Sequence, residues 1–379
     1  MKKKMNNEIL LPSSFSHEEH TQWLSMPEEQ CTPLFEAAYE KKKQYFGNKV
    51  FIRGLIEVSN QCAKNCLYCG IRRENHHVIR YNIPEKEVFQ LVDFAVQKGL
   101  GSVVIQSGEI TSKEFITSID RLIRYIMKIS NGQMGITLSC GEQTEDTYRR
   151  WFENGAHRYL LRIEASNPRL YEQIHPADGR HDYKSRLNAL YTLKKIGYHF
   201  GTGVMIGLPF QTPGDLASDL LFMKQLEVDM VGMGPYLEHE HTPLMQYASL
   251  LPSPHERFIL TLKMIALLRL MMPDINIAAT TALQVIYANG RERALTCGAN
   301  VVMPNITPPL YKSQYNLYRN KPAKDLEAES IHTSLVNTLQ AMGMEIAFHS
   351  RGDAPHYLNR THPPLPSSSH TEKKFPEKQ

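Results

Sequence analysis

The chain has 379 residues, of which 42% are hydrophobic and 22% charged, and its formal net charge is only +4. This length suits one large domain or two ordinary ones, and the small charge gives no indication of nucleic-acid binding. Six cysteines are too few for a disulfide scaffold, and no segment resembles a signal peptide or a membrane span. We therefore expect a soluble, cytoplasmic protein with free thiols.

Short β-rich runs alternate with amphipathic stretches through the middle of the chain. The first run, 50–59, precedes a helical pattern over 84–99, and the second, 102–107, precedes one over 112–130. Further strands are predicted at 135–139, 158–164, 199–207, 229–234, 276–281 and 300–305. Eight strands separated by helices over about 255 residues predict an α/β fold, a full (β/α)8 TIM-type barrel.

The two ends of the chain are expected to lie outside the strands and helices of the barrel. Residues 1–49 read as an N-terminal helical prefix with its best helix at 31–47, and 50–349 as the barrel with a C-terminal capping segment. Residues 350–379 are rich in Pro, Ser and His, which predicts a disordered tail. A barrel of this type carries its chemistry in the loops after the carboxyl ends of the strands.

Three cysteines lie in the loop after the first predicted strand, with the spacing Cys62-x3-Cys66-x2-Cys69. Thiolates at this density bind zinc or an iron–sulfur cluster. Zinc would need a fourth ligand, such as His76 or His77, whereas three thiolates on a 4Fe–4S cube leave one iron open for a cofactor or substrate. A disulfide among them is disfavoured in the cytosol. The spacing favours the open cluster and leaves zinc as an alternative.

The predicted fourth strand carries charges on one face. With a period of two, its faces are Arg158, Leu160, Arg162 and Glu164 on one side, and Tyr159, Leu161 and Ile163 on the other. The apolar face would pack under the helices, so the polar face would point into the barrel. Buried Arg and Glu are costly unless they are paired or bind a ligand, so this face indicates either a structural ion pair or, as we favour, a polar cavity.

The cysteine motif, with Tyr68 before its last cysteine, resembles the signature of radical S-adenosylmethionine (SAM) enzymes. Within that superfamily the chain is most similar to the FeFe-hydrogenase maturases of the HydE type, and less so to biotin and methylornithine synthases. The similar segments are IRGLIEVSNQCAKNCLYCGIRREN, VIQSGE, YLLRIEASNP, MIGLPFQT, DMVGMGPY, AATTA and CGANVVMPN. The resemblance extends from about residue 46 to about residue 318, which is most of the barrel.

The resemblance implies a 4Fe–4S cluster on Cys62, Cys66 and Cys69, with SAM on the open iron and reductive cleavage of SAM to a 5′-deoxyadenosyl radical. It implies a SAM site formed by Tyr68, Ser107, Gly108, Glu109, Arg162, Glu164 and Arg186. The loop Ser107–Glu109 would receive the methionyl amine, and Arg186 would bind the SAM carboxylate in a bidentate contact. It implies a substrate cavity lined by Gln106, Thr137, Arg158, Met230, Met303, Tyr315 and Tyr318.

The task implied by the resemblance is assembly of the FeFe-hydrogenase H-cluster. The substrate would be a small organometallic complex, a cysteine-bound iron carrying CO and cyanide, supplied by another maturase. The reductant would be ferredoxin or flavodoxin, with no role for nucleic acid or membrane. The alternatives are a methylornithine- or biotin-synthase-like reaction and a non-enzymatic zinc module. No cysteine follows Cys297, which excludes a second cluster on C-terminal cysteines.

Overall fold

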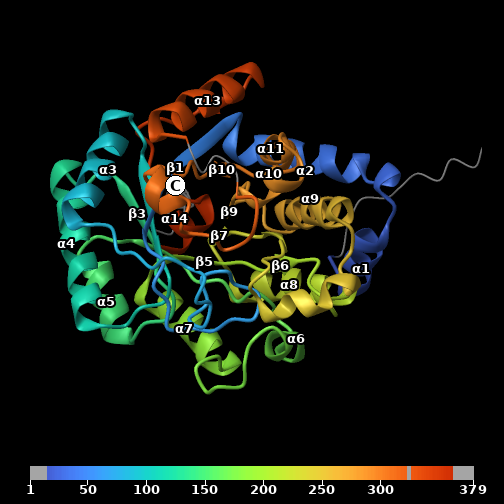
Figure 1. Ribbon diagram of the computed structural model, residues 1–379. Helices are drawn as coiled ribbons and strands as arrows, with labels where there is room; N and C mark the ends of the chain where they lie inside the picture. The colour runs from blue at the N-terminus through green and yellow to red at the C-terminus, as the bar shows by residue number, and fades with distance from the viewer. Residues whose placement is uncertain (1–14, 322–325, 362–379) are drawn as a thin grey trace, which may run out of the picture.

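The computed structural model describes residues 15–321 and 326–361. Parallel strands form the centre of the molecule and helices surround them (Figure 1). The strands are β1 (Lys49–Ser59), β2 (Ser102–Ser107), β3 (Gly135–Ser139), β4 (Arg158–Leu160), β5 (His199–Thr202), β6 (Met205–Ile206), β7 (Met230–Val231), β8 (Gly234–Pro235), β9 (Asn276–Ile277), β10 (Val301–Val302) and β11 (Glu345–Ile346).

The helices mostly follow the strands one by one along the chain. They are α1 (His17–Ser25), α2 (Thr32–Phe46), α3 (Glu85–Gln97), α4 (Lys113–Ile129), α5 (Glu145–Glu153), α6 (Pro168–Gln173), α7 (Tyr183–Ile196), α8 (Pro213–Leu226), α9 (Pro254–Met271), α10 (Ala282–Ile286), α11 (Gly290–Leu295), α12 (Pro309–Lys312), α13 (Ala328–Ala341) and α14 (Pro355–Thr361), with 3₁₀ segments at Glu28–Gln30 and Pro243–Leu250. Each helix in these ranges is too short or too polar to cross a lipid bilayer.

The sheet closes on itself, as the sequence predicted. Its strand order is β10-β1-β2-β3-β4-β5-β7-β9, every neighbouring pair is parallel, and β11 adds to β1. The two outer strands are joined by a parallel bridge between Ala278 and Val301, where Ala279 N–H donates to Val301 O at 2.9 Å. The fold is therefore the predicted TIM-type barrel.

Several strands are shorter than predicted. The predicted strand 158–164 forms regular pairs only over β4, although Leu161 N–H still donates to Gly201 O at 3.0 Å. The predicted strand 199–207 divides into β5 and β6 because the chains cross very closely at Gly203, where a Cβ atom would overlap Gly232 O. The two short strands beyond this crossing, β6 and β8, pair with each other in a separate two-stranded sheet.

Local signals fix the helices that cover the barrel. Ser112 caps α4 by accepting from Phe115 N–H at 3.3 Å, and Ser253 with Glu256 forms a capping box at the start of α9. The helical prefix is present as α1 and α2, which pack against α8 and α9. Tyr159, on the outward face of the fourth strand, is buried as predicted, and its ring meets those of Tyr148 and Trp151 in α5.

The prediction of disorder from residue 350 onward is wrong for residues 350–361. This segment crosses the amino end of the barrel and ends in α14 (Figure 1). Its Asp353 carboxylate and Gly352 carbonyl form hydrogen bonds with residues inside the barrel. The segment is held by polar groups rather than by an apolar face, so composition did not reveal it. The rest of the predicted tail, 362–379, lies outside the described residues.

Candidate functional site

The three clustered cysteines lie at the carboxyl end of the barrel, in the loop that leaves β1. Burial raises the pKa of Cys66 to about 12, and the neighbouring Cys62 thiol adds to that shift. Burial raises the pKa of Cys69 well above its ordinary value, with Cys66 and Cys62 again contributing. Buried thiols become thiolates when a cationic centre compensates the charge. The donor set suits a metal cluster, because the three thiols are only half-buried and lie close enough for Cys62 to raise the pKa of both Cys66 and Cys69.

The described residues include no group of three or more His, Cys, Asp and Glu side chains placed to hold a single metal ion. A 4Fe–4S cube does not require such convergence, because each thiolate binds a different iron. Of the two histidines considered as zinc ligands, His77 stacks on His241 with ring centroids 4.0 Å apart, and His76 is exposed.

The loop after β2 packs directly on the cysteine loop. Glu109 N–H donates to Cys62 Sγ at 3.3 Å, and Ala63 N–H donates to Glu109 O at 2.9 Å. Gly108 is required here, because a Cβ atom at this position would overlap Gln61 O. The predicted Ser107–Glu109 loop is thus in contact with the cysteine motif.

A network of buried charges surrounds this contact. Lys64 Nζ lies 3.2 Å from Glu109 Oε1 and 3.1 Å from Glu142 Oε2. Arg186 Nε lies 2.5 Å from Glu142 Oε1, and Arg186 Nη2 lies 3.5 Å from Glu109 Oε2. Burial alone would lower the pKa of Arg186, but the carboxylates of Glu142 and Glu109 raise it well above its usual value. The structure therefore joins Arg186 to the loops after β2 and β3.

Sequence reasoning missed Lys64 and Glu142, although one signal was present. The chain repeats a Gly-Glu pair after two consecutive strands, at Gly108-Glu109 after β2 and at Gly141-Glu142 after β3. Since carboxyl ends of neighbouring parallel strands meet at one edge, this repeat could have indicated two carboxylates side by side.

Arg162 and Glu164 form a second ion pair just beyond β4, with Nη2 and Oε2 3.0 Å apart. Arg162 Nη2 also donates to Val204 O at 2.8 Å, and Glu164 adopts a left-handed φ of 67°. Burial raises the pKa of Glu164, opposed by Arg162. Arg162 Nε and Glu164 Oε2 are buried without a hydrogen-bond partner. A ligand with both donor and acceptor groups would satisfy them.

Tyr68 also lies at this end of the barrel. Its hydroxyl is 3.3 Å from His175 Nε2, and the two rings meet edge to face with centroids 5.4 Å apart. Burial raises the pKa of Tyr68 well above its usual value, with Cys66 the next largest cause. Tyr68 therefore stays protonated and close to the cysteine thiols.

The segment after the barrel covers the same end. Gln106 Nε2 donates to the Tyr315 hydroxyl at 3.2 Å, and Gly70 N–H donates to Leu317 O at 2.9 Å. Tyr318 is half-buried; burial raises its pKa above its usual value, with a further contribution from Glu57. Lys321, which sequence reasoning missed, lies 2.5 Å from Glu57 Oε1.

Three of the predicted cavity residues lie deeper in the barrel. Thr137, Met230 and Met303 line an internal cavity of about 20 Å³ together with Arg53 and Asn276. Thr137 Oγ1 is buried there without a hydrogen-bond partner. These three residues therefore face the interior of the barrel.

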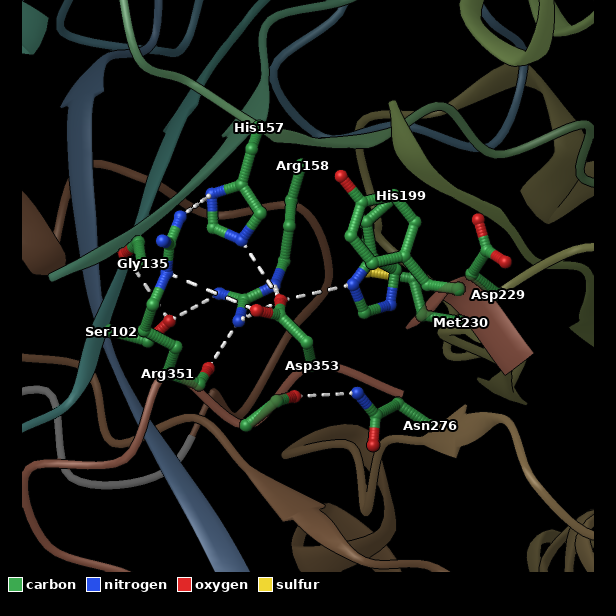
Figure 2. A network of polar contacts seen from close by, with 12 residues as sticks. Ser102, Gly135, His157, Arg158, His199, Asp229, Met230, Asn276, Arg351 and Asp353 are labelled. Carbon is green, nitrogen blue, oxygen red and sulfur yellow. Dashed lines mark hydrogen bonds and ion pairs between the residues drawn. The ribbon is translucent and has the colours of Figure 1, made fainter. Parts of the chain in front are cut away.

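Arg158 differs from its prediction as a residue of the substrate cavity. It is the first residue of β4, so it lies at the amino end of the barrel, opposite to the cysteine loop. Its guanidinium is fully buried and donates to Asp353 Oδ1 from Nη2 at 2.7 Å (Figure 2). It does not line the internal cavity. Parity along the strand gave the correct face, and the place in the substrate cavity, which only the resemblance implied, does not fit this end of the barrel.

Comparisons with known proteins give the family of the chain. Residues 56–223 match the Radical SAM superfamily. The chain is 45% identical over 288 residues to the FeFe-hydrogenase maturase subunit HydE of Thermotoga maritima, covering 76% of this chain and 79% of that protein. It is 28% identical to 3-methylornithine synthase of Methanosarcina acetivorans, covering 84% of this chain and 87% of that protein.

Two solved structures share the fold. Methylornithine synthase (PylB) superposes with a TM-score of 0.74 at 25% identity, covering 89% of this chain and 95% of that one. The maturase HydG of Carboxydothermus hydrogenoformans superposes with a TM-score of 0.73 at 20% identity, covering 88% and 76%, which supports the fold alone. Membership of the superfamily implies a 4Fe–4S cluster and SAM. With the extent of its identity to a HydE maturase, the chain belongs to the HydE family of FeFe-hydrogenase maturases, which are radical SAM enzymes.

Proposed function

We propose that this enzyme binds a 4Fe–4S cluster through Cys62, Cys66 and Cys69 and cleaves SAM reductively during assembly of the FeFe-hydrogenase H-cluster. The observation that carries the proposal is the gathering of three neighbouring thiols beside two buried ion-pair networks at the carboxyl end of the barrel. When bound, the cluster and SAM supply a 5′-deoxyadenosyl radical after one-electron reduction by a ferredoxin or flavodoxin.

The residues of the chain would bind and orient SAM. Carbonyl groups of the Ser107–Glu109 loop and the Glu109 carboxylate suit the methionyl ammonium, while the Arg186 guanidinium suits its carboxylate. The unpartnered atoms Arg162 Nε and Glu164 Oε2 would form hydrogen bonds with the rest of the ligand. Tyr68 lies against the cysteine thiols and would shield this site from water.

The substrate would occupy the lumen below SAM. We propose a cysteine-bound iron complex carrying CO and cyanide, delivered by another maturase, with Gln106, Thr137, Met230, Met303, Tyr315 and Tyr318 around it. Arg53 is buried at the base of this space with its Nε unpartnered, which favours an anionic occupant. A dry, enclosed cavity would also protect a radical from side reactions.

An anaerobic reconstitution tests the proposal. Protein purified without oxygen and supplied with iron and sulfide should become brown and, after reduction with SAM, should release 5′-deoxyadenosine. Expression in a strain that lacks its HydE should then restore hydrogenase activity. A colourless protein that retains zinc and forms no 5′-deoxyadenosine would contradict the proposal.

A second candidate is the rearrangement of lysine to methylornithine. It is favoured by the fold match to methylornithine synthase and by 28% identity over most of the chain. Incubation of the reconstituted enzyme with lysine separates the two candidates, because formation of methylornithine would support the second one.

A further inference from the structure

The segment at the C-terminal end of the described chain is bonded to the starts of several barrel strands. His349 N–H donates to Gly99 O at 2.7 Å, just before β2. The Gly352 carbonyl accepts from Arg53 Nη2 of β1 at 3.3 Å and from Asn276 Nδ2 of β9 at 2.8 Å. Arg53 and Asn276 line the internal cavity, so Gly352 lies directly beneath it. Gly352 and its neighbour Ala354 are both buried.

The Asp353 carboxylate is the centre of this contact (Figure 2). Its Oδ1 accepts from Arg158 Nη2 at 2.7 Å and lies 2.9 Å from His157 Nε2 and 3.2 Å from His199 Nδ1. Arg158 also donates to Ser102 Oγ at 2.5 Å and to the Arg351 carbonyl. One carboxylate therefore joins the starts of β4 and β5 and fixes the guanidinium of Arg158.

Helix α14 is attached by a second carboxylate. Asp229, just before β7, lies 2.8 Å from His356 Nδ1 and accepts from Arg360 Nη2 at 2.6 Å. Asp229 is itself fully buried. The segment is therefore fastened on both sides of Asp353, to strands that lie around much of the barrel.

We propose that residues 350–361 are a plug that closes the amino end of the barrel, and that Asp353 is its positioning residue. The carboxylate holds Arg158 at this end and out of the lumen, so ligands reach the lumen only from the cysteine end. The contacts require an acidic side chain at this position, because Arg158 and Arg53 are both buried and Asp353 is the carboxylate that faces them among the described residues.

The plug goes beyond the proposed function, because it does not depend on which substrate the lumen takes. It gives Arg158 a positioning role in place of a substrate contact. Its test needs neither cluster nor SAM, so its failure would leave the proposed function untouched.

Access to the amino end can be measured with an introduced thiol. Ser102 is 1% exposed and lies at the start of β2, so Ser102→Cys places a thiol of similar size beneath the plug. Iodoacetamide labelling followed by peptide mapping separates this thiol from the six native ones. We expect labelling to become at least about tenfold faster when Asp353→Ala is added, and unchanged when the exposed Glu36 is replaced in Glu36→Ala. Equal rates in all three folded proteins would overturn the plug.

Chemical rescue identifies the missing group as a carboxylate. Tens of millimolar formate should slow labelling of the Asp353→Ala protein again and raise its melting temperature, with no effect of either kind in the Glu36→Ala protein. We expect Asp353→Ala to lower the melting temperature by about 5–10 °C before rescue. Failure of formate to restore either quantity would overturn the positioning role of Asp353.

Hydrogen exchange of the unaltered full chain provides a test that needs no variant. Amides of 350–361 should be protected and should open together with those at the starts of β4 and β5. Exchange of 350–361 at the rate of an unstructured peptide would overturn the proposal.

Discussion

The two ends of the barrel both bury carboxylates, but they satisfy them differently. At the amino end, each oxygen of Asp229 has a partner: Oδ1 has His356, while Oδ2 has Arg360 and Phe200 N–H. At the carboxyl end, Glu142 Oε1 and Glu164 Oε2 are buried without a hydrogen-bond partner, although each lies within ion-pair distance of an arginine. Guanidinium Nε atoms without partners occur at both ends.

The contrast suggests a division of roles along the barrel axis. An unsatisfied buried polar group costs about 1–3 kcal/mol, so a protein retains such groups where a ligand completes them. The carboxylates Asp229 and Asp353 of the amino end are paired within the chain, which suits that end to stability. The carboxyl end is incomplete and is suited to binding. This agrees with the general placement of chemistry in barrels of this type.

The largest expected effect is at the carboxyl end. Cys69→Ala should reduce formation of 5′-deoxyadenosine to background, because a cube held by two thiolates lacks the third protein ligand. Cys140 is buried at the end of β3 and serves as the matched control, since Cys140→Ala should retain the chromophore and most activity. The assay is product analysis after anaerobic reconstitution. Equal loss in the two variants would remove the distinction between a cluster ligand and a structural thiol.

The next effect is at the amino end and concerns stability. Asp229→Ala should lower the free energy of unfolding by about 3–5 kcal/mol, because it leaves Arg360 and His356 without their buried partner. Urea denaturation measures the change, and the exposed Glu36→Ala is the control. SAM affinity of the folded variant should stay within about twofold of the parent. A large loss of SAM affinity would show that the two ends are coupled, against the division proposed above.

A smaller effect should separate binding from stability at the carboxyl end. Arg186→Lys keeps the charge but removes the planar fork, so SAM should bind about 10–100-fold more weakly. The exposed Arg149, paired with Glu145 at 2.8 Å, provides a matched Arg→Lys control with no expected change in affinity. Calorimetric titration of the reconstituted protein with SAM measures both. Unchanged affinity in Arg186→Lys would assign Arg186 to the ion-pair network alone.

Parts of the fold governed by local pattern were predictable from sequence. Strands β2 and β3 have the predicted bounds, and they pair with each other over five consecutive residues. The predicted helices at 84–99 and 112–130 appear as α3 and α4 with small differences at their ends. The position of the cysteine loop followed from the motif and from the strand before it, so the cysteine part of the site could also be predicted from the sequence.

Contacts between distant residues were not predictable. Asp353 meets Arg158 across 195 positions of sequence, and the composition around it resembles a disordered tail. Lys64 likewise meets Glu142 across 78 positions. In both cases the distant segments are held together by polar contacts, which leave no hydrophobic periodicity in the sequence. The period-two pattern shows which side chains share a face of a strand. It therefore identified the inward side of β4, but it could not show at which end of the barrel Arg158 lies.

The smallest expected effect is on the pH dependence of stability, and it arises from histidines at the amino end of the barrel. Burial lowers the pKa of His199 to about 4 and that of His157 to about 3, so both stay neutral in the folded protein at pH 5. The unfolded chain protonates them below about pH 6.5, so their contribution to stability is lost as pH falls from 7 to 5, by about 2 kcal/mol each. His356, whose pKa is raised by its hydrogen bond to Asp229, acts in the opposite direction and offsets part of this loss. The lowered pKa of Asp353 adds nothing in this window, because that carboxylate is ionised in both states.

His199→Asn should make this pH dependence shallower by about 2 kcal/mol between pH 7 and 5, because it removes one group that the unfolded chain protonates. Asparagine retains a donor that can reach Asp353, so the plug should remain in place. Thermal denaturation across the pH series measures the slope, and the exposed His76→Asn is the control. A slope identical to that of the parent would mean that His199 is not held neutral by burial. The amino end would then owe its stability to the Asp353–Arg158 and Asp229–Arg360 pairs, with no contribution from a neutral His199.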